Sequence, residues 1–79
     1  MVDERIQDVF REVFRDDDLE VVEATSKADI PGWDSLTDVK LVIAIEEEFQ
    51  TRFTTQEVGH VRTVGDFVEA LARRGIRVR

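Results

Sequence analysis

Apolar residues recur every three to four positions in three parts of the chain, as they do on one face of an amphipathic helix. These parts are residues 3–15, 35–50 and 64–74. A shorter helical turn is predicted over residues 55–60. No stretch longer than three residues alternates between apolar and polar positions as a half-buried strand does. The pattern therefore predicts an all-α fold, a small antiparallel helical bundle of three main helices plus one short helix.

Residues that favour helix ends lie at several of these boundaries. Thr63 precedes the last helical segment, where its hydroxyl can accept a backbone N–H, and Gly75 follows that segment as a suitable stop. Ser35 and Asp38 have the spacing of a capping box. This spacing predicts that the Ser35 hydroxyl accepts a backbone N–H at the start of the second long helix.

The segment between the first two long helices, residues 16–34, shows no single periodicity. An acidic run opens it, and Pro31-Gly32 breaks it near its end. The run lacks the ligand spacing of a calcium loop, so we expect a solvated turn. A loop of this length is uncommon in a compact domain, and its apolar residues predict that it is pinned to the core. These residues are Leu19, Val21, Val22, Ile30 and Trp33.

The second long helix carries two apolar stripes where a surface helix of a small bundle needs only one. At about 100° per residue, the two stripes are separate, with centres about 140° apart around the helix. The first is Leu41, Val42, Ile45 and Phe49, and the second is Leu36, Val39 and Ile43. The Leu36–Val39–Ile43 stripe has two interpretations: it packs under the 16–34 segment, or it is an exposed docking patch flanked by charge.

Composition limits the classes of function. The chain has 79 residues, enough for one domain, which we expect to span residues 1–79, and too few for a deep catalytic cleft. Its net charge of -7 disfavours nucleic acid as a partner and, with the small size, favours a monomer. No apolar run approaches the roughly 18 residues of a membrane span. The charged start of the chain carries no signal-peptide segment, so we expect a cytoplasmic protein.

Few residues can support catalysis or bind a metal. The sequence has no cysteine, which excludes disulfides and thiol nucleophiles, and His60 is its one histidine. A Ser35, His60 and Asp34 triad is formally available. However, Asp34 adjoins the serine instead of orienting a histidine, and no oxyanion loop is visible. We therefore expect no catalytic residue and no metal ligand in this chain.

Ser35, which follows Asp34, is the residue with the most informative position. One interpretation is an ordinary N-cap serine. The other rests on the free N–H groups and dipole of a helix N-terminus, which stabilise anions, so a serine there is a suitable anchor for a phosphodiester group. Trp33 is interpreted as a core residue that closes the preceding loop, with a wall beside a group on Ser35 as the alternative.

The stretch from Gly32 to Phe49, Gly-Trp-Asp-Ser-Leu-Thr-Asp-Val-Lys-Leu-Val-Ile-Ala-Ile-Glu-Glu-Glu-Phe, strongly resembles an acyl carrier protein. The Asp-Ser-Leu triplet, the Val and Leu at matching offsets and the Glu-Glu-Glu-Phe end carry the resemblance. Residues 63–67 are also similar to the start of that family's last helix. A bare Asp-Ser-Leu is a weak signal, whereas the triplet inside this whole stretch is a strong one.

This resemblance implies that Ser35 carries phosphopantetheine, moved from coenzyme A by a phosphopantetheinyl transferase that uses magnesium. The thiol of the arm would hold acyl groups as thioesters for acyl-loading, synthase or acyltransferase enzymes, with the carrier itself catalysing nothing. Asp34 would mark the site for recognition. The implied partner-binding residues are Leu36, Val39, Ile43, Glu46 and Glu47, the two acids meeting basic docking patches.

Several features depart from the family's usual pattern. Lys40 stands where fatty-acid carriers commonly have an acid, Trp33 replaces a small residue, and residues 53–61 are less acidic than usual. The C-terminal arginines, which we expect to form a frayed, solvated tail, are also atypical: Arg73, Arg74, Arg77 and Arg79. The departures favour a specialised fatty-acid, polyketide or related pathway. An aminoacyl or peptidyl carrier, and an unmodified carrier-like domain that binds a partner through the Leu36–Val39–Ile43 stripe, stay open.

Overall fold

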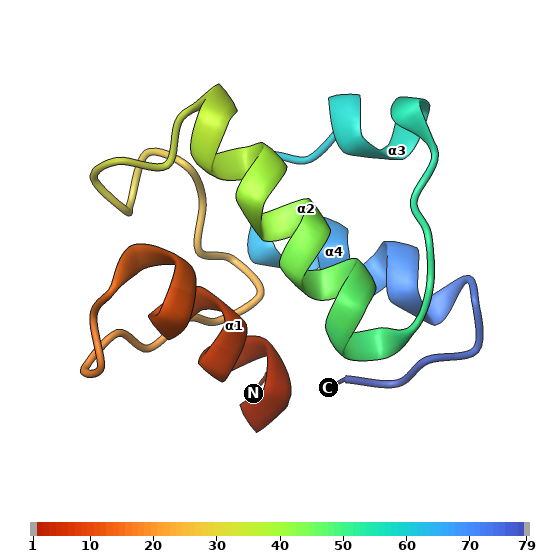
Figure 1. The fold of residues 1–79 in the computed structure, drawn as a ribbon, viewed down its shortest axis with the longest axis horizontal. Helices are drawn as coiled ribbons and strands as arrows, with labels where there is room; N and C mark the ends of the chain where they lie inside the picture. Colours follow the sequence, from red (N-terminus) through yellow and green to blue (C-terminus); the bar gives the residue numbers. More distant parts are fainter. Residues whose placement is uncertain (1, 79) are drawn as a thin grey trace.

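The computed structural model describes residues 2–78, and within that range it contains four helices and no strand. They are α1 (Glu4–Phe14), α2 (Ser35–Phe49), α3 (Thr55–Gly59) and α4 (Val64–Ala72). In Figure 1, α2 runs through the centre, α1 lies on one side of it, α4 lies behind it, and the chain after α2 leads to the short α3. The predicted all-α bundle of three main helices plus one short helix is confirmed.

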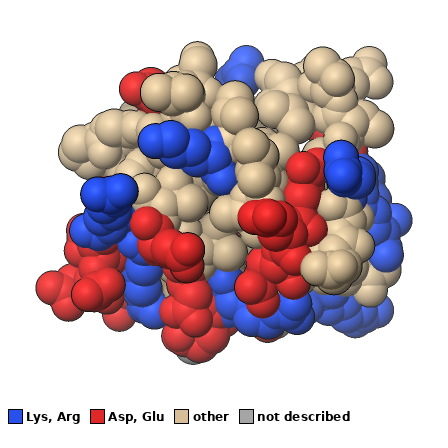
Figure 2. All heavy atoms as spheres, in the orientation of Figure 1, with Lys and Arg blue, Asp and Glu red and all other residues tan. Residues whose placement is uncertain are grey.

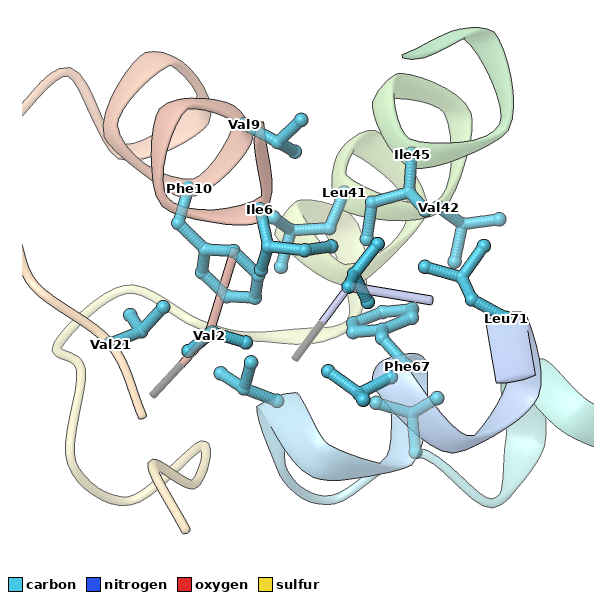
Figure 3. Packing of buried hydrophobic residues seen from close by; sticks show 14 of the residues in the cluster. Val2, Ile6, Val9, Phe10, Val21, Leu41, Val42, Ile45, Phe67 and Leu71 are labelled. Carbon is cyan, nitrogen blue, oxygen red and sulfur yellow. The ribbon is translucent and has the colours of Figure 1, made fainter. Parts of the chain in front are cut away.

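The core lies where α1, α2 and α4 face one another (Figure 3). The first apolar stripe of α2 is buried there, as predicted, and Leu41 and Ile45 are fully enclosed. Phe10 of α1 packs edge-on against Phe67 of α4, with ring centroids 6.4 Å apart. Burying such side chains provides the main driving force for folding in a chain of this size.

The ends of α1 and α2 show a backbone feature that the sequence pattern did not indicate. Arg15 and Gln50, each directly after its helix, adopt the left-handed conformation with φ of 53°. In α4 this role belongs to Gly75, with φ of 78°, and the Ile76 N–H donates to the Leu71 carbonyl at 3.0 Å. The predicted stop at Gly75 is therefore confirmed, although regular helix already ends at Ala72.

The long 16–34 segment is pinned to the core, as predicted, at Val21, Ile30 and Trp33. Val21 is held by the buried Gln7 side chain, which donates to its carbonyl at 2.6 Å and accepts from its N–H at 2.8 Å. The prediction fails for Val22, which is 54% exposed, because its neighbour takes the inward position in this extended stretch. The acidic run at 16–18 is exposed, as a solvated turn should be.

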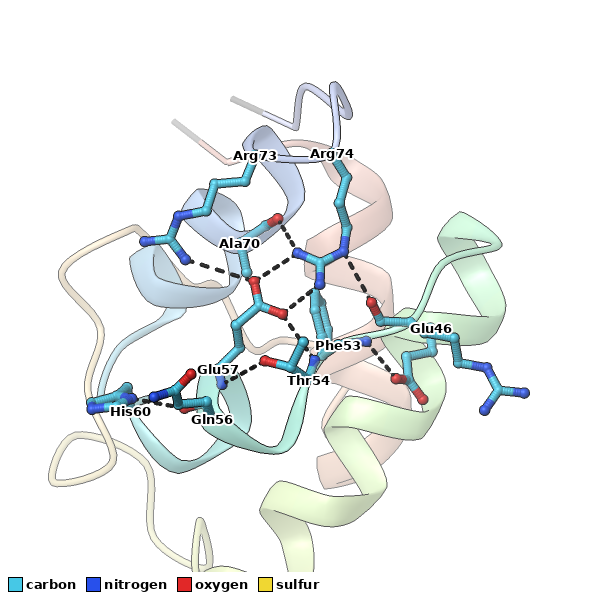
Figure 4. A network of polar contacts seen from close by, with 10 residues as sticks. Glu46, Phe53, Thr54, Gln56, Glu57, His60, Ala70, Arg73 and Arg74 are labelled. Carbon is cyan, nitrogen blue, oxygen red and sulfur yellow. Dashed lines mark hydrogen bonds and ion pairs between the residues drawn. The ribbon is translucent and has the colours of Figure 1, made fainter.

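Arg74 was predicted to lie in a solvated tail, and this prediction is wrong. Its guanidinium pairs with both carboxylate oxygens of Glu57 in α3 (Figure 4). It also donates to the Ala70 carbonyl at 2.7 Å and to the Arg52 carbonyl at 2.9 Å, and lies 5.1 Å from the centre of the Phe53 ring. Arg74 thus joins α3, the loop before it and the end of α4.

The rest of the C-terminal segment is also anchored in part. Arg73 pairs with the same α3 carboxylate at 3.7 Å. Val78 is buried, and its carbonyl accepts the Asp3 N–H at 2.7 Å. Arg77 is exposed, as expected for a tail, and Arg79 lies outside the described residues.

Glu57 is held by more than its arginine partner. It completes a capping box with Thr54, in which each side chain accepts the other residue's backbone N–H. The Arg74 hydrogen bond, followed by the Thr54 N–H, lowers the pKa of Glu57 from 4.5 to about 2. The same pair raises the pKa of Arg74. The carboxylate therefore stays ionised in the folded protein until the solution is strongly acidic.

We expect Arg74→Gln to lower the free energy of unfolding by about 1–2 kcal/mol at neutral pH, since it removes charge-assisted hydrogen bonds from a half-buried carboxylate. A carboxyl group with a depressed folded pKa stabilises the protein above its unfolded pKa, and this contribution is lost as the pH falls from 4.5 toward 2. Urea unfolding of parent and variant should therefore give midpoints that converge as the pH falls. Arg77→Gln, which alters an exposed arginine, is the control, and a gap that stays constant into that acidic range would contradict the prediction.

Candidate functional site

Asp34, not Ser35, is the N-cap of α2. Its carboxylate accepts the Thr37 backbone N–H at 2.9 Å while its own backbone is extended. The predicted capping box from Ser35 to Asp38 is therefore wrong. Aspartate and serine are about equally good N-caps. The helix begins at Ser35, one residue before the start that a Ser35 cap would give, so Asp34 is the residue that accepts the Thr37 N–H.

Ser35 is consequently the first residue of α2 and is not used as its cap. Its side chain is exposed, and its hydroxyl has no hydrogen-bond partner within residues 2–78. The turn before it depends on Gly32, which has φ of 91° and whose carbonyl accepts the Asp34 N–H at 3.0 Å. Only glycine adopts that conformation without strain, so the Pro31-Gly32 break directs the chain into the start of α2.

Hydrogen bonds from the Thr37 backbone and side chain lower the pKa of Asp34 below its usual 3.8. The carboxylate next to Ser35 is therefore ionised at neutral pH. Because it is already bonded to the helix, it is a poor proton acceptor, and it presents a fixed negative charge beside the hydroxyl.

The Leu36–Val39–Ile43 stripe lies open on the surface. Leu36 is 67% exposed, and Val39 and Ile43 are each 51% exposed. The interpretation in which this stripe packs under the 16–34 segment is therefore wrong, because that segment packs on the core instead. In Figure 2, uncharged surface predominates toward the end where α2 begins, and acidic side chains gather toward its other end.

The charged side chains around this stripe differ in their exposure and in whether they already have a partner within the protein. Lys40 and Glu47 are exposed, and neither side chain has an ion-pair partner in the part of the chain that the structure describes. Glu46 is half-buried, and its carboxylate accepts the Phe53 N–H at 2.8 Å. Glu46 therefore helps to hold the loop after α2, while Glu47 is the acid available to another molecule.

Asp38 is a buried acid, which the sequence reasoning considered only as a capping-box partner of Ser35. It is 7% exposed, accepts the Trp33 indole N–H at 3.0 Å, and accepts from the Lys27 ammonium group at 3.3 Å. A signal was present, because Asp38 lies about 200° around the helix from Leu36 and thus on the core face. Trp33 is buried against the core, so its interpretation as a core residue is confirmed.

His60 takes no part in this arrangement. It is exposed at the end of α3, where its Nδ1 lies 2.7 Å from the Gln56 carbonyl. No contact among the described residues joins it to the Ser35 hydroxyl. Within residues 2–78, no group of three or more histidine, cysteine or acidic side chains is placed to hold a metal ion. The same range contains no helix long and apolar enough to span a membrane.

Comparisons with known proteins establish the family. The acyl carrier protein of Phenylobacterium zucineum is 38% identical over 71 residues, which are 90% of each chain. That of Caulobacter vibrioides is 37% identical over 71 residues, covering 90% of this chain and 91% of its own. No protein-family profile matches the sequence. This chain belongs to the acyl carrier protein family.

Two solved structures share its fold. The holo acyl carrier protein of Geobacter metallireducens superposes with a TM-score of 0.77 and 32% identity, over 90% of this chain and 86% of that one. A candidate acyl carrier protein of Mycobacterium tuberculosis superposes with a TM-score of 0.80 and 25% identity, over 90% of this chain and 95% of that one. The family resemblance seen in the sequence is therefore confirmed by overall structure.

We expect Asp34→Ala to lower the free energy of unfolding by clearly more than Ser35→Ala does, because the first turn of α2 loses its cap. Ser35→Ala should change it by less than about 0.5 kcal/mol, since the hydroxyl has no partner in the described part of the chain. Asp34→Asn is the matched control, because asparagine caps as well as aspartate does. Urea unfolding measures all three variants. If Ser35→Ala lost as much free energy of unfolding as Asp34→Ala, the serine would be a cap after all.

Proposed function

We propose that this protein carries phosphopantetheine on Ser35 and presents acyl groups, bound as thioesters, to partner enzymes. The observation that carries the proposal is the exposed Ser35 hydroxyl at the first position of α2, which has no hydrogen-bond partner within the described range. In this proposal the protein is a carrier, and its partners perform the catalysis.

The residues around Ser35 fit a phosphate ester. A group on the first residue of a helix lies beside its free N–H groups and at the positive end of its dipole. The exposed side chain leaves room for an arm to extend into solvent. When bound, the group would supply a thiol, which the sequence cannot provide because it contains no cysteine.

In the loading step, the Ser35 oxygen forms a bond to the phosphorus of the pantetheine half of coenzyme A. The pyrophosphate P–O bond breaks, adenosine 3′,5′-bisphosphate leaves, and the hydroxyl proton passes to a base on the transferase, with magnesium bound by that enzyme. Asp34 is bonded to Thr37, so its proposed role is recognition and not proton transfer.

Partner enzymes would contact the Leu36–Val39–Ile43 stripe, with Glu46 and Glu47 at its acidic end. Glu47 is the stronger candidate for direct ion pairing in this proposal, because the Glu46 carboxylate already accepts the Phe53 N–H. Exposed charges of this kind mainly speed the encounter with a partner of opposite charge. The exposed Lys40 differs from the usual acid of fatty-acid carriers and supports a specialised fatty-acid, polyketide or related pathway.

We expect the parent protein to gain the mass of one phosphopantetheine when incubated with coenzyme A, magnesium and a broad-specificity phosphopantetheinyl transferase. Ser35→Ala should gain nothing. Intact-mass spectrometry measures both, with a known carrier as positive control. An unmodified parent beside a modified control would favour the unmodified interaction domain.

The loaded protein also tests the pathway. If housekeeping fatty-acid enzymes elongated its acyl group as fast as they elongate the acyl group on their own carrier, that result would contradict a specialised role.

We expect Val39→Ser and Ile43→Ser each to raise the KM for loading about tenfold while kcat stays near the parental value, because they remove apolar contact area without touching the hydroxyl. Steady-state kinetics of the transferase measure the two constants. Val22→Ser is the matched control, because Val22 is an equally exposed valine outside the stripe. The same rise in KM for Val22→Ser would remove the stripe's special role.

A further inference from the structure

Burying the Asp38 carboxylate costs desolvation free energy, which its hydrogen-bond partners must offset. Acids are rarely buried in small domains, and one left unpaired is strongly destabilising. Here each carboxylate oxygen has its own donor, the Trp33 indole N–H on Oδ1 and the Lys27 ammonium on Oδ2. We refer to Trp33, Asp38 and Lys27 together as the Asp38 cluster.

The Asp38 cluster connects α2 to several other parts of the chain. The Trp33 ring meets Phe10 and Phe14 of α1 edge-on, with centroids 5.5 Å and 6.4 Å apart. The Lys27 N–H donates to the Arg62 carbonyl at 3.1 Å, just before α4. Asp38 is therefore the point at which the loop before α2 is tied both to the helix and to its neighbours.

Ser35 lies between two members of this cluster in the chain. Trp33 precedes it by one intervening residue, and Asp38 follows in the first turn of α2. The Asp38 N–H donates to the Asp34 carbonyl at 2.9 Å. Because the Ser35 side chain has no hydrogen bond among the described residues, the backbone on either side of it determines where its hydroxyl points.

We propose that the Asp38 cluster is a positioning device, which fixes the Asp34–Ser35 turn in the geometry that a phosphopantetheinyl transferase requires. This inference rests on the proposed function. Replacing a buried ionic group by apolar side chains of similar volume is often neutral or stabilising, so stability alone is a weak reason for one here. A precise geometry is a stronger reason, since misplacement of a reacting atom by about 1 Å can slow a reaction a hundredfold.

Three substitutions test this role in the full-length protein. Asp38→Ala removes both hydrogen bonds, and Trp33→Phe keeps an aromatic ring but removes the indole N–H. Each should lower kcat for arm transfer about tenfold with KM within about twofold, because the docking stripe is intact. Asp38→Asn retains an oxygen for the indole N–H and should restore kcat to within about threefold of the parent.

Gln7→Ala is the matched control for lost stability. It breaks two buried hydrogen bonds to Val21 and leaves the Asp38 cluster unchanged. At a temperature where every variant is folded, it should load at the parental rate. Parental kcat in both Asp38→Ala and Trp33→Phe, or an equal fall in Gln7→Ala, would overturn the positioning role. If Asp38→Ala does not fold, Trp33→Phe and Asp38→Asn still decide it.

A spectroscopic measurement separates this inference from the proposed function. Trp33 is the only tryptophan in the sequence, so its indole N–H gives a single assignable NMR signal. Asp38→Ala should shift that signal and the backbone amide signal of Ser35, and Asp38→Asn should leave both near the parental positions. An unchanged Ser35 signal in Asp38→Ala would overturn the inference. If Asp38→Ala shows the expected shifts but the parent protein cannot be loaded, the proposed function would be overturned instead.

Discussion

The hydrogen bond from the Thr37 backbone N–H to the Asp34 carboxylate fixes where α2 begins, and the candidate site follows from it. Because Asp34 satisfies the first turn, Ser35 is left on the outer surface with a hydroxyl that no residue from 2 to 78 bonds. The same helix then turns one apolar stripe into the core and the other into solvent. A cap of ordinary strength at Asp34 thus leaves the adjacent Ser35 without a structural role at the start of α2.

The sequence predicted the parts of this structure that depend on local periodicity. The positions of the helices and the buried face of α2 follow from the spacing of apolar residues, which tertiary packing reinforces. The acyl carrier resemblance also pointed to Ser35 before any geometry was known. The choice between the two interpretations of the Leu36–Val39–Ile43 stripe needed the structure, because it depends on where the 16–34 segment packs.

The errors lie where a residue's role depends on a distant or competing partner. Asp34 and Ser35 are both good caps, so spacing could not decide between them. Arg74 pairs with a carboxylate 17 positions away in the chain, which no local pattern reveals. The burial of Asp38 was missed although the sequence carried a signal for it. An acid on the core face of a helix needs a buried partner for its charge.

The two ends of the described chain meet, since the Asp3 N–H donates to the Val78 carbonyl at 2.7 Å (Figure 1). Both ends lie away from the start of α2. A short linker could therefore join them, with new ends opened in the exposed acidic run at 16–18. Circular permutation of this kind is tolerated when termini are close and surface loops are cut. The same geometry would let this fold be inserted into a loop of a larger protein while α2 remained accessible.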